Sequence, residues 1–150
     1  MDIGLNIVAD LDSNSKSHSM IKISELMESF FKDKHYGAIN YYWIVCMAVS
    51  PDYGKFASVS RPMFKETYRL LRPDRTKEEL KGVYTCGFNF DADEFKLLVS
   101  STDEETERII ARKVVDSLSN LDRLSKKAAA FDKERFKSDL IKLFKDNNLI

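Results

Sequence analysis

The first apolar positions of the chain alternate with polar or small ones. Ile3, Leu5 and Ile7 occupy every second position, which is typical of a β-strand with one buried face. Residues 41–49, YYWIVCMAV, are apolar on both faces, and a strand covered on both sides lies in the middle of its sheet. We therefore expect Trp43, inside this segment, to belong to the core. Three further strands are expected at residues 55–60, 83–91 and 94–101.

Apolar residues recur at three- and four-residue steps in other segments, which indicates helices with one buried face. The first such segment covers residues 19–35 and presents Ile23 and Met27 on its apolar face. Residues 61–71 fit either a helix or a strand; we favour a helix because their apolar residues then form one stripe. A short helical turn is expected at residues 76–82.

The C-terminal part of the chain has the pattern of two helices. Thr102 and Glu105 form a capping box, which marks a helix start. An unbroken helix from there to Asp146 would span about 66 Å at 1.5 Å per residue, too long for a compact domain of this size. We therefore expect a break near Asp132, a good N-cap. The expected buried faces are Ile110, Val114, Leu118 and Leu121 in the first helix and Phe136, Leu140, Leu143 and Phe144 in the second.

Together these elements predict an α+β fold. The sheet is expected to be mainly antiparallel, with about five strands, because short turns join most neighbouring strands. Helices would pack on this sheet, with two helices at the C-terminus. The sequence shows no linker or internal repeat, so a single domain over residues 1–150 is the simplest organisation.

The composition is that of an ordinary globular protein, with 43% hydrophobic and 32% charged residues. Basic and acidic residues balance at 24 each, whereas a dedicated nucleic-acid or membrane-surface binder normally carries a basic excess. The chain begins without a charged leader, and its longest apolar run is shorter than the ~20 residues of a membrane helix. We expect a cytoplasmic protein without a membrane or nucleic-acid partner, in which the widely spaced Cys46 and Cys86 stay reduced.

Residues 10–21, DLDSNSKSHSMI, match a calcium loop only in part. Oxygen-bearing side chains stand at positions 1, 3 and 5 of such a loop. However, Ser15 stands where the loop needs glycine for its sharp turn, and Ile21 where it needs a bidentate glutamate. A solvated loop is therefore the better interpretation of this stretch.

Motifs for catalysis are absent from the sequence. His18 and His35 have no second ligand at a metal-binding spacing, and neither cysteine stands at a zinc-ligand spacing from another ligand. The nucleophile elbow GxSxG, the phosphate loop GxxxxGK[ST] and the GxGxxG turn are all missing. We expect no catalytic residue, no metal and no cofactor, and therefore no enzyme.

Carboxylates are concentrated in one short part of the chain, around DADE and the start of the long helix. In one interpretation they decorate a turn and complement the helix dipole. In the other they form an acidic surface for a basic partner; metal-assisted hydrolysis by DADE has no convergent ligand set to support it. The candidate partner-binding residues are Asp91, Asp93, Glu94, Asp103, Glu104, Glu105 and Glu107.

A basic stripe is the competing charged feature. Lys65, Arg69 and Arg72 fall at i, i+4 and i+7 of the segment interpreted as a helix. Such a stripe is normally a solvated helix face, but it could contact phosphates or an acidic partner. It lacks the interleaved aromatic residues of a single-strand binder.

Four stretches together resemble a known class of proteins. They are MDIGLNIVAD, the aromatic strand NYYWIVCMAVS with its lone Trp43, the acidic FDADEF and the charged helical C-terminus. In this combination the chain resembles the small cytosolic immunity proteins of bacterial polymorphic-toxin and contact-dependent growth inhibition systems.

That resemblance implies a non-enzyme that binds a cognate toxin domain and blocks its active site. Many such toxins are nucleases with basic clefts, which an acidic surface would suit. Two alternatives stay open: an enzyme whose site assembles only in three dimensions, and a small regulatory or nucleic-acid-binding module. If the resemblance holds, we expect the neighbouring upstream gene to encode a large secreted protein with a C-terminal toxin domain.

Overall fold

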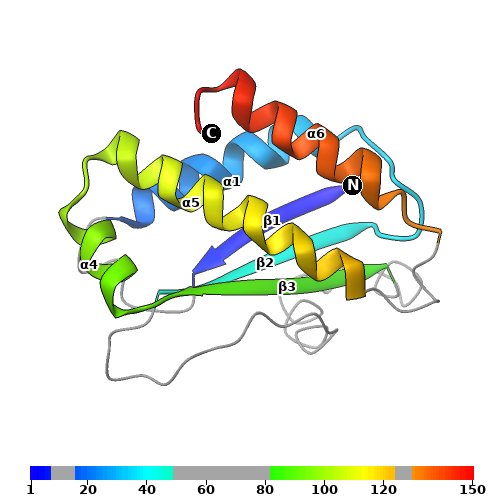
Figure 1. Cartoon of the computed structure of the whole chain (residues 1–150). Helices are drawn as coiled ribbons and strands as arrows, with labels where there is room; N and C mark the ends of the chain where they lie inside the picture. Colours follow the sequence, from blue (N-terminus) through cyan, green and yellow to red (C-terminus); the bar gives the residue numbers. More distant parts are fainter. Residues whose placement is uncertain (8–15, 49–81, 124–129) are drawn as a thin grey trace.

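In a computed structural model, the described residues form a three-stranded sheet with helices packed on one face (Figure 1). The structure describes residues 1–7, 16–48, 82–123 and 130–150. The elements in chain order are β1 (Asp2–Ile7), α1 (Ser17–Phe31), β2 (Tyr41–Ala48), β3 (Val83–Phe90), α4 (Ala92–Ser100), α5 (Asp103–Ser117), the 3₁₀ helix η3 (Leu118–Arg123) and α6 (Lys133–Asp146).

The described strands are all parallel, in the order β1-β2-β3. Ile3 of β1 pairs with Tyr42 of β2, and Tyr42 pairs with Tyr84 of β3. β2 is therefore central, as its two apolar faces predict. Helix α1 crosses between β1 and β2, and such a crossover is what allows two consecutive strands to run parallel.

The prediction of a mainly antiparallel sheet of about five strands with two C-terminal helices is therefore wrong. The described residues form a three-stranded parallel sheet and four α-helices. Residues 94–101, expected as a strand, belong to helix α4, so no hairpin follows β3. The expected strand 55–60 and helix 61–71 lie outside the described residues, as does the expected turn 76–82 apart from Gly82. Of the expected loop at residues 10–21, residues 10–15 also lie outside, and helix α1 begins already at Ser17, so the end of this stretch is helical.

The two helices at the end of the chain begin where the sequence predicts. Thr102 and Glu105 form the capping box of α5, and Asp132 is the N-cap of α6, accepting a hydrogen bond from the backbone N–H of Arg135 at 3.2 Å. The predicted apolar faces of both helices are buried. These starts are confirmed because a cap is a local interaction that sequence spacing alone defines.

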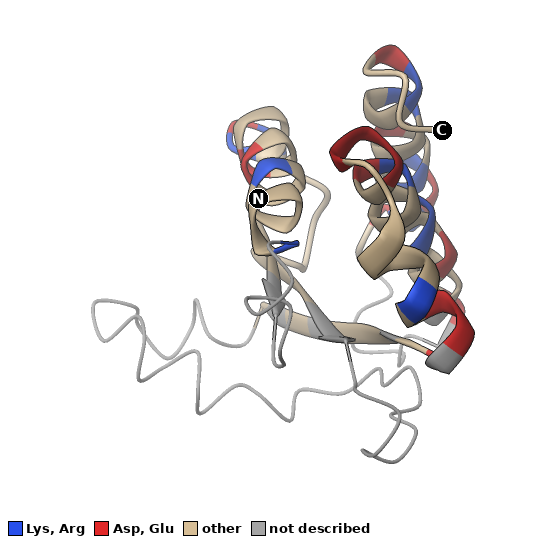
Figure 2. Ribbon diagram, turned by 90° about the vertical axis from the view of Figure 1, so that its left-hand side faces the viewer, with Lys and Arg blue, Asp and Glu red and all other residues tan. Residues whose placement is uncertain are grey.

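The helices cover one face of the sheet. In the end-on view of Figure 2, α1 stands over β1, and α5 and α6 stand over the β3 side. The core between the layers includes an aromatic cluster centred on Phe136 of α6, which is fully buried. Its ring centroid lies 4.8 Å from that of Tyr42 and 5.3 Å from that of Phe31. Phe136 thus joins α6, β2 and α1 in one contact.

Gly37 shapes the connection between α1 and β2. Its φ of 99° lies in the left-handed region that favours glycine. A Cβ atom at this position would lie 1.9 Å from the carbonyl oxygen of Ala130. Because Gly37 has no Cβ, the loop can approach the chain entering α6, where the N–H of Asp132 donates to the carbonyl of Tyr36 at 2.7 Å.

Trp43 is buried, as expected, with 5% of its surface exposed. Its neighbours in sequence, Tyr42 and Ile44, face the helices, so alternation along the strand points Trp43 to the opposite face of the sheet. The Tyr41 ring packs edge-on against it at 6.1 Å. Both faces of β2 are therefore covered.

Candidate partner-binding surface

The first group of predicted acidic residues lies at the start of α4. Asp91 is the N-cap, and its Oδ1 accepts a hydrogen bond from the backbone N–H of Glu94 at 2.8 Å. This bond lowers the pKa of the Asp91 carboxyl below its usual value. Glu94 forms an ion pair with Lys113 of α5, whereas Asp93 is exposed. One of the three carboxylates caps the helix, and one joins α4 to α5.

The second group lies at the start of α5. The backbone N–H of Thr102 donates to Glu105 Oε2 at 2.8 Å, which completes the capping box. Asp103 and Glu104 are exposed in the same turn, where negative charge complements the positive end of the helix dipole. This turn therefore has both a structural role and a charged outer surface.

Glu107 differs from the other predicted residues because it is buried. It accepts a hydrogen bond from Lys22 of α1 at 2.8 Å, and only 11% of its side chain is exposed. The ion pair raises the pKa of Lys22 above its usual value, chiefly through the hydrogen bond. Glu107 thus joins α5 to α1 and is not available at the surface.

The two acidic groups lie at opposite ends of α4, about 14 Å apart at 1.5 Å per residue. Figure 2 shows them as separate red segments at the starts of α4 and α5. The seven predicted residues therefore do not form a single cluster. Of the seven, the exposed carboxylates are Asp91, Asp93, Asp103, Glu104 and Glu105.

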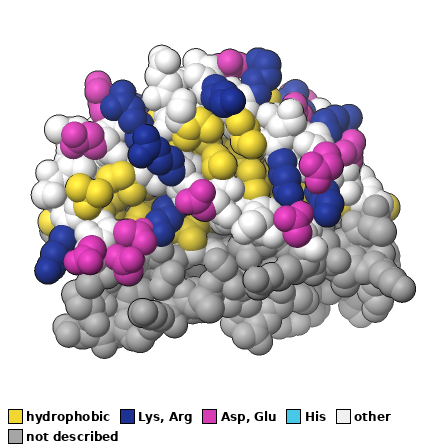
Figure 3. Space-filling model, in the orientation of Figure 1, with side chains coloured by type: hydrophobic (Ala, Val, Ile, Leu, Met, Phe, Trp, Pro, Cys, Tyr) yellow, Lys and Arg dark blue, Asp and Glu magenta, His cyan; other side chains and the backbone are white. Residues whose placement is uncertain are grey.

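Exposed apolar residues lie between these two groups. Leu97 and Val99 of α4 are 59% and 38% exposed, while Leu98 between them is completely buried. Leu97 borders a groove of about 480 Å³ between α4 and α5. In the space-filling view, hydrophobic side chains gather over α4 with charged residues around them (Figure 3). The groove is lined by Leu97, Ser100, Ser101, Glu105, Arg108, Ile109 and Arg112.

This apolar centre was not predicted, because the pattern of residues 94–101 was interpreted as a strand. In a helix that begins at Asp91, Phe95 and Leu98 are three residues apart and face inwards. Leu97 and Val99 then face outwards. The signal that could have revealed this was the aspartate at 91 followed by glutamate three residues later, a capping pattern for a helix start.

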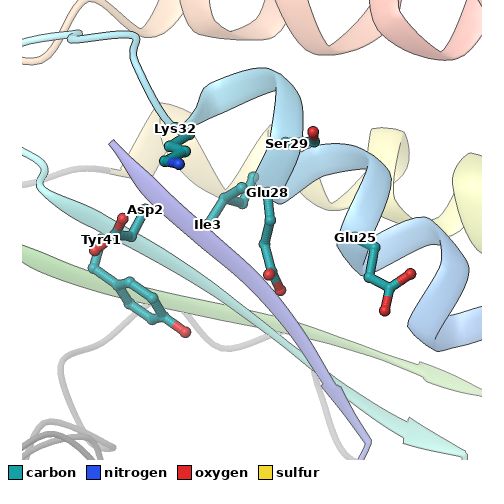
Figure 4. Close-up of a pocket in the computed structure, with 7 residues that line it drawn as sticks. All are labelled: Asp2, Ile3, Glu25, Glu28, Ser29, Lys32 and Tyr41. Carbon is teal, nitrogen blue, oxygen red and sulfur yellow. The ribbon is translucent and has the colours of Figure 1, made fainter.

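A second groove, of about 490 Å³, lies between α1 and β1 (Figure 4). It is lined by Glu25, Glu28 and Ser29 of α1 and by its C-cap Lys32, together with residues from β1 and β2. The strand edge behind it is covered, since the backbone N–H of Leu5 donates to Ser24 Oγ at 3.2 Å. An extended segment therefore has no free strand edge to pair with at Leu5.

Other candidate chemistry is not brought together by the structure. Within the described part of the chain, no three histidine, cysteine or acidic side chains are close enough to hold a metal ion. His18 and His35 are exposed, and Cys86 is a buried free thiol whose pKa is raised to about 11 by burial. Lys65, Arg69 and Arg72 lie outside the described residues.

None of the described helices is both long and apolar enough to cross a bilayer.

An exposed apolar centre with a charged border is the pattern of a protein-binding surface. The class of protein agrees with this pattern. The sequence matches the Immunity protein 44 family over residues 1–146, and the chain therefore belongs to that family. Comparison with curated proteins and with solved structures gives no match. The family shows an immunity protein of a toxin system, with a toxin protein as its partner.

Proposed function

We propose that this protein inhibits its cognate toxin domain by binding it directly through the α4–α5 surface and covering its active site. The α4–α5 surface is defined by Asp91, Asp93, Leu97, Val99, Asp103, Glu104 and Glu105. In this proposal the protein acts by binding and not by catalysis, in the cytoplasm of the bacterium that carries the toxin system. The toxin would present a basic cleft, such as that of a nuclease.

The observation that carries the proposal is that three exposed carboxylates form no ion pair with another described residue. Asp93, Asp103 and Glu104 neither cap a helix nor form an ion pair with another described residue. They lie at the two ends of α4, so both groups fit within one ordinary interface of about 800 Å² per partner. Charges of this kind steer a basic partner to the surface and raise the association rate.

The experiment neutralises these three residues together, as Asp93→Asn, Asp103→Asn and Glu104→Gln. The toxin domain encoded next to the immunity gene is the binding partner, and protection is scored by bacterial growth when the two are co-expressed. We expect at least a tenfold weaker affinity, mainly through slower association, and a smaller dependence on salt. Thermal unfolding should show only a modest loss, because the three side chains make no helix cap or ion pair with described residues but lie in the first turns of α4 and α5, where each negative charge contributes about 0.3–1 kcal/mol.

A matched control removes the same charge elsewhere. The control variant combines Glu25→Gln, Asp33→Asn and Glu134→Gln. These three residues are exposed and lie on α1, just after α1 and at the start of α6. This triple variant should bind and protect like the wild type. Equal weakening by both variants would show that only total charge matters, and unchanged binding in the first would exclude the α4–α5 surface.

A further inference from the structure

We propose that the groove between α4 and α5 receives a large apolar side chain of the toxin domain, with a carboxylate beside it that pairs with Arg112. This inference rests on the proposed function and adds the position and chemistry of the interface centre. Its starting point is Leu97, whose 59% exposure is the highest among the large apolar residues of the described chain.

The groove has an apolar wall on each side. Leu97 comes from α4 and the partly buried Ile109 from α5, and the serines at the junction of the two helices close one end. At about 480 Å³ the groove has more room than a single large side chain needs. Buried apolar anchors in such pockets dominate the energy of protein interfaces, and the border mainly excludes water.

The charge changes sign along α5 beside the groove. Asp103, Glu104 and Glu105 occupy the first turn, and Arg108 and Arg112 follow on one helix face, four residues apart. Arg112 forms no ion pair with any described residue, whereas Lys113 next to it is paired with Glu94. A partner must therefore present basic groups at one end of the groove and a carboxylate at the other. This requirement fixes the orientation of the toxin domain.

The groove is held open by contacts within the fold. The buried Lys16 donates to the carbonyl oxygen of Ser101 at 2.7 Å. The hydroxyls of Ser101 and Thr106 lie 2.7 Å apart, and the Glu94–Lys113 ion pair fixes the other end of α4. A preformed groove loses little conformational entropy on binding, which favours slow dissociation.

The experiment measures association and dissociation rates with the toxin domain encoded next to the immunity gene. The variants are Leu97→Ala and Arg112→Gln, and the matched control is Ile21→Ala, an apolar residue of α1 with 53% exposure that does not line the groove. We expect Leu97→Ala to dissociate at least tenfold faster, with an association rate within about twofold of the wild type. Arg112→Gln should dissociate at least fivefold faster, and Ile21→Ala should match the wild type.

The outcomes separate this inference from the proposed function. If the wild type does not bind the toxin domain, both fail. If the wild type binds and the acidic triple variant binds more weakly, but Leu97→Ala dissociates at the wild-type rate, the groove is excluded as a binding site and the proposed function stands.

Sedimentation of the free protein tests whether a second copy of the chain occupies the groove. A dimer that Leu97→Arg converts to monomer, with toxin binding unchanged, would overturn the inference. Melting temperatures within a few degrees of the wild type confirm that the variants are folded.

Discussion

Helices α6 and α4 use their apolar residues in opposite ways. In α6, Phe136 is completely buried against the rings of Phe31 and Tyr42 from two other elements. In α4, Leu98 is buried, but Leu97 and Val99 point to solvent. Both helices begin at an aspartate cap. Similar local sequence can therefore lead to a stabilising core contact or to a free surface, depending on whether the chain supplies a facing layer.

Phe136→Ala should produce the largest effect on stability. The variant leaves a cavity among at least four aromatic rings, and such truncations cost roughly 3–5 kcal/mol. Leu97→Ala is the comparison from α4 and should stay within about 0.5 kcal/mol of the wild type. Urea denaturation measures both. Similar losses in the two variants would mean that α4 is part of the core after all.

Alkaline pH should also distinguish the core from the surface. Burial raises the pKa of the Cys86 thiol from its usual 9.0 to about 11, and the thiol lies 3.2 Å from the Tyr42 hydroxyl. Above pH 9 the unfolded thiol loses its proton while the folded one keeps it, so the unfolded state binds fewer protons and stability falls as pH rises. Between pH 9 and 11 this group alone should remove up to about 3 kcal/mol.

Cys86→Ala tests this contribution. The variant should be less stable at pH 7, where it loses packing, but its stability should fall less steeply between pH 9 and 11 than that of the wild type. The measurement is urea denaturation at half-unit pH steps. Burial also raises the pKa of the Tyr42 hydroxyl, and Cys86 raises it further, so the variant also reduces the contribution of Tyr42 and the comparison measures the Cys86–Tyr42 pair. Parallel curves for the two proteins would contradict the assignment to Cys86.

Thr102→Ala should have a smaller effect on stability than Phe136→Ala or the ionisation of Cys86, because it acts at the surface. It removes the side-chain cap of α5, which accepts the N–H of Glu105 at 3.3 Å. Loss of such a cap costs about 1 kcal/mol. Thr102→Ser retains the hydroxyl and should recover most of the loss in a thermal unfolding experiment. If serine and alanine behaved alike, the cap would contribute nothing measurable here.

Local signals in the sequence predict the single elements better than their arrangement. The strands at β1, β2 and β3 and the starts of α5 and α6 follow from alternation, helical periodicity and caps. The segment after Asp91 satisfies two patterns at once, since Phe95, Leu97 and Val99 alternate while Phe95 and Leu98 are three apart. The segment forms a helix, and Asp91 caps its N-terminus. Whether strands pair in parallel depends on long-range crossovers that no local window contains.

The candidate surface was predictable to a similar extent. The sequence places Asp103, Glu104 and Glu105 correctly at a helix start, where acidic residues complement the dipole. The other group, from Asp91 to Glu94, was expected in a turn between two strands and instead begins helix α4. The sequence does not show that Glu107 forms an ion pair with Lys22, which is 85 residues away along the chain. The sequence also does not show that Leu97 and Val99 are exposed. Their exposure depends on helix α4, and the interpretation of residues 94–101 as a strand excluded that helix.

The parallel sheet has a consequence for the order in which this protein is built. Asp2 pairs with Tyr41, and Tyr41 pairs with Val83, so each strand pairing closes a loop of about forty residues. Loop closure of this kind slows folding, because entropy is lost before the contacts form. During synthesis β1, α1 and β2 are available as a unit before β3 emerges. Helices α4 and α5 follow β3 directly, so we expect the α4–α5 surface to be completed late, on strands that are already paired.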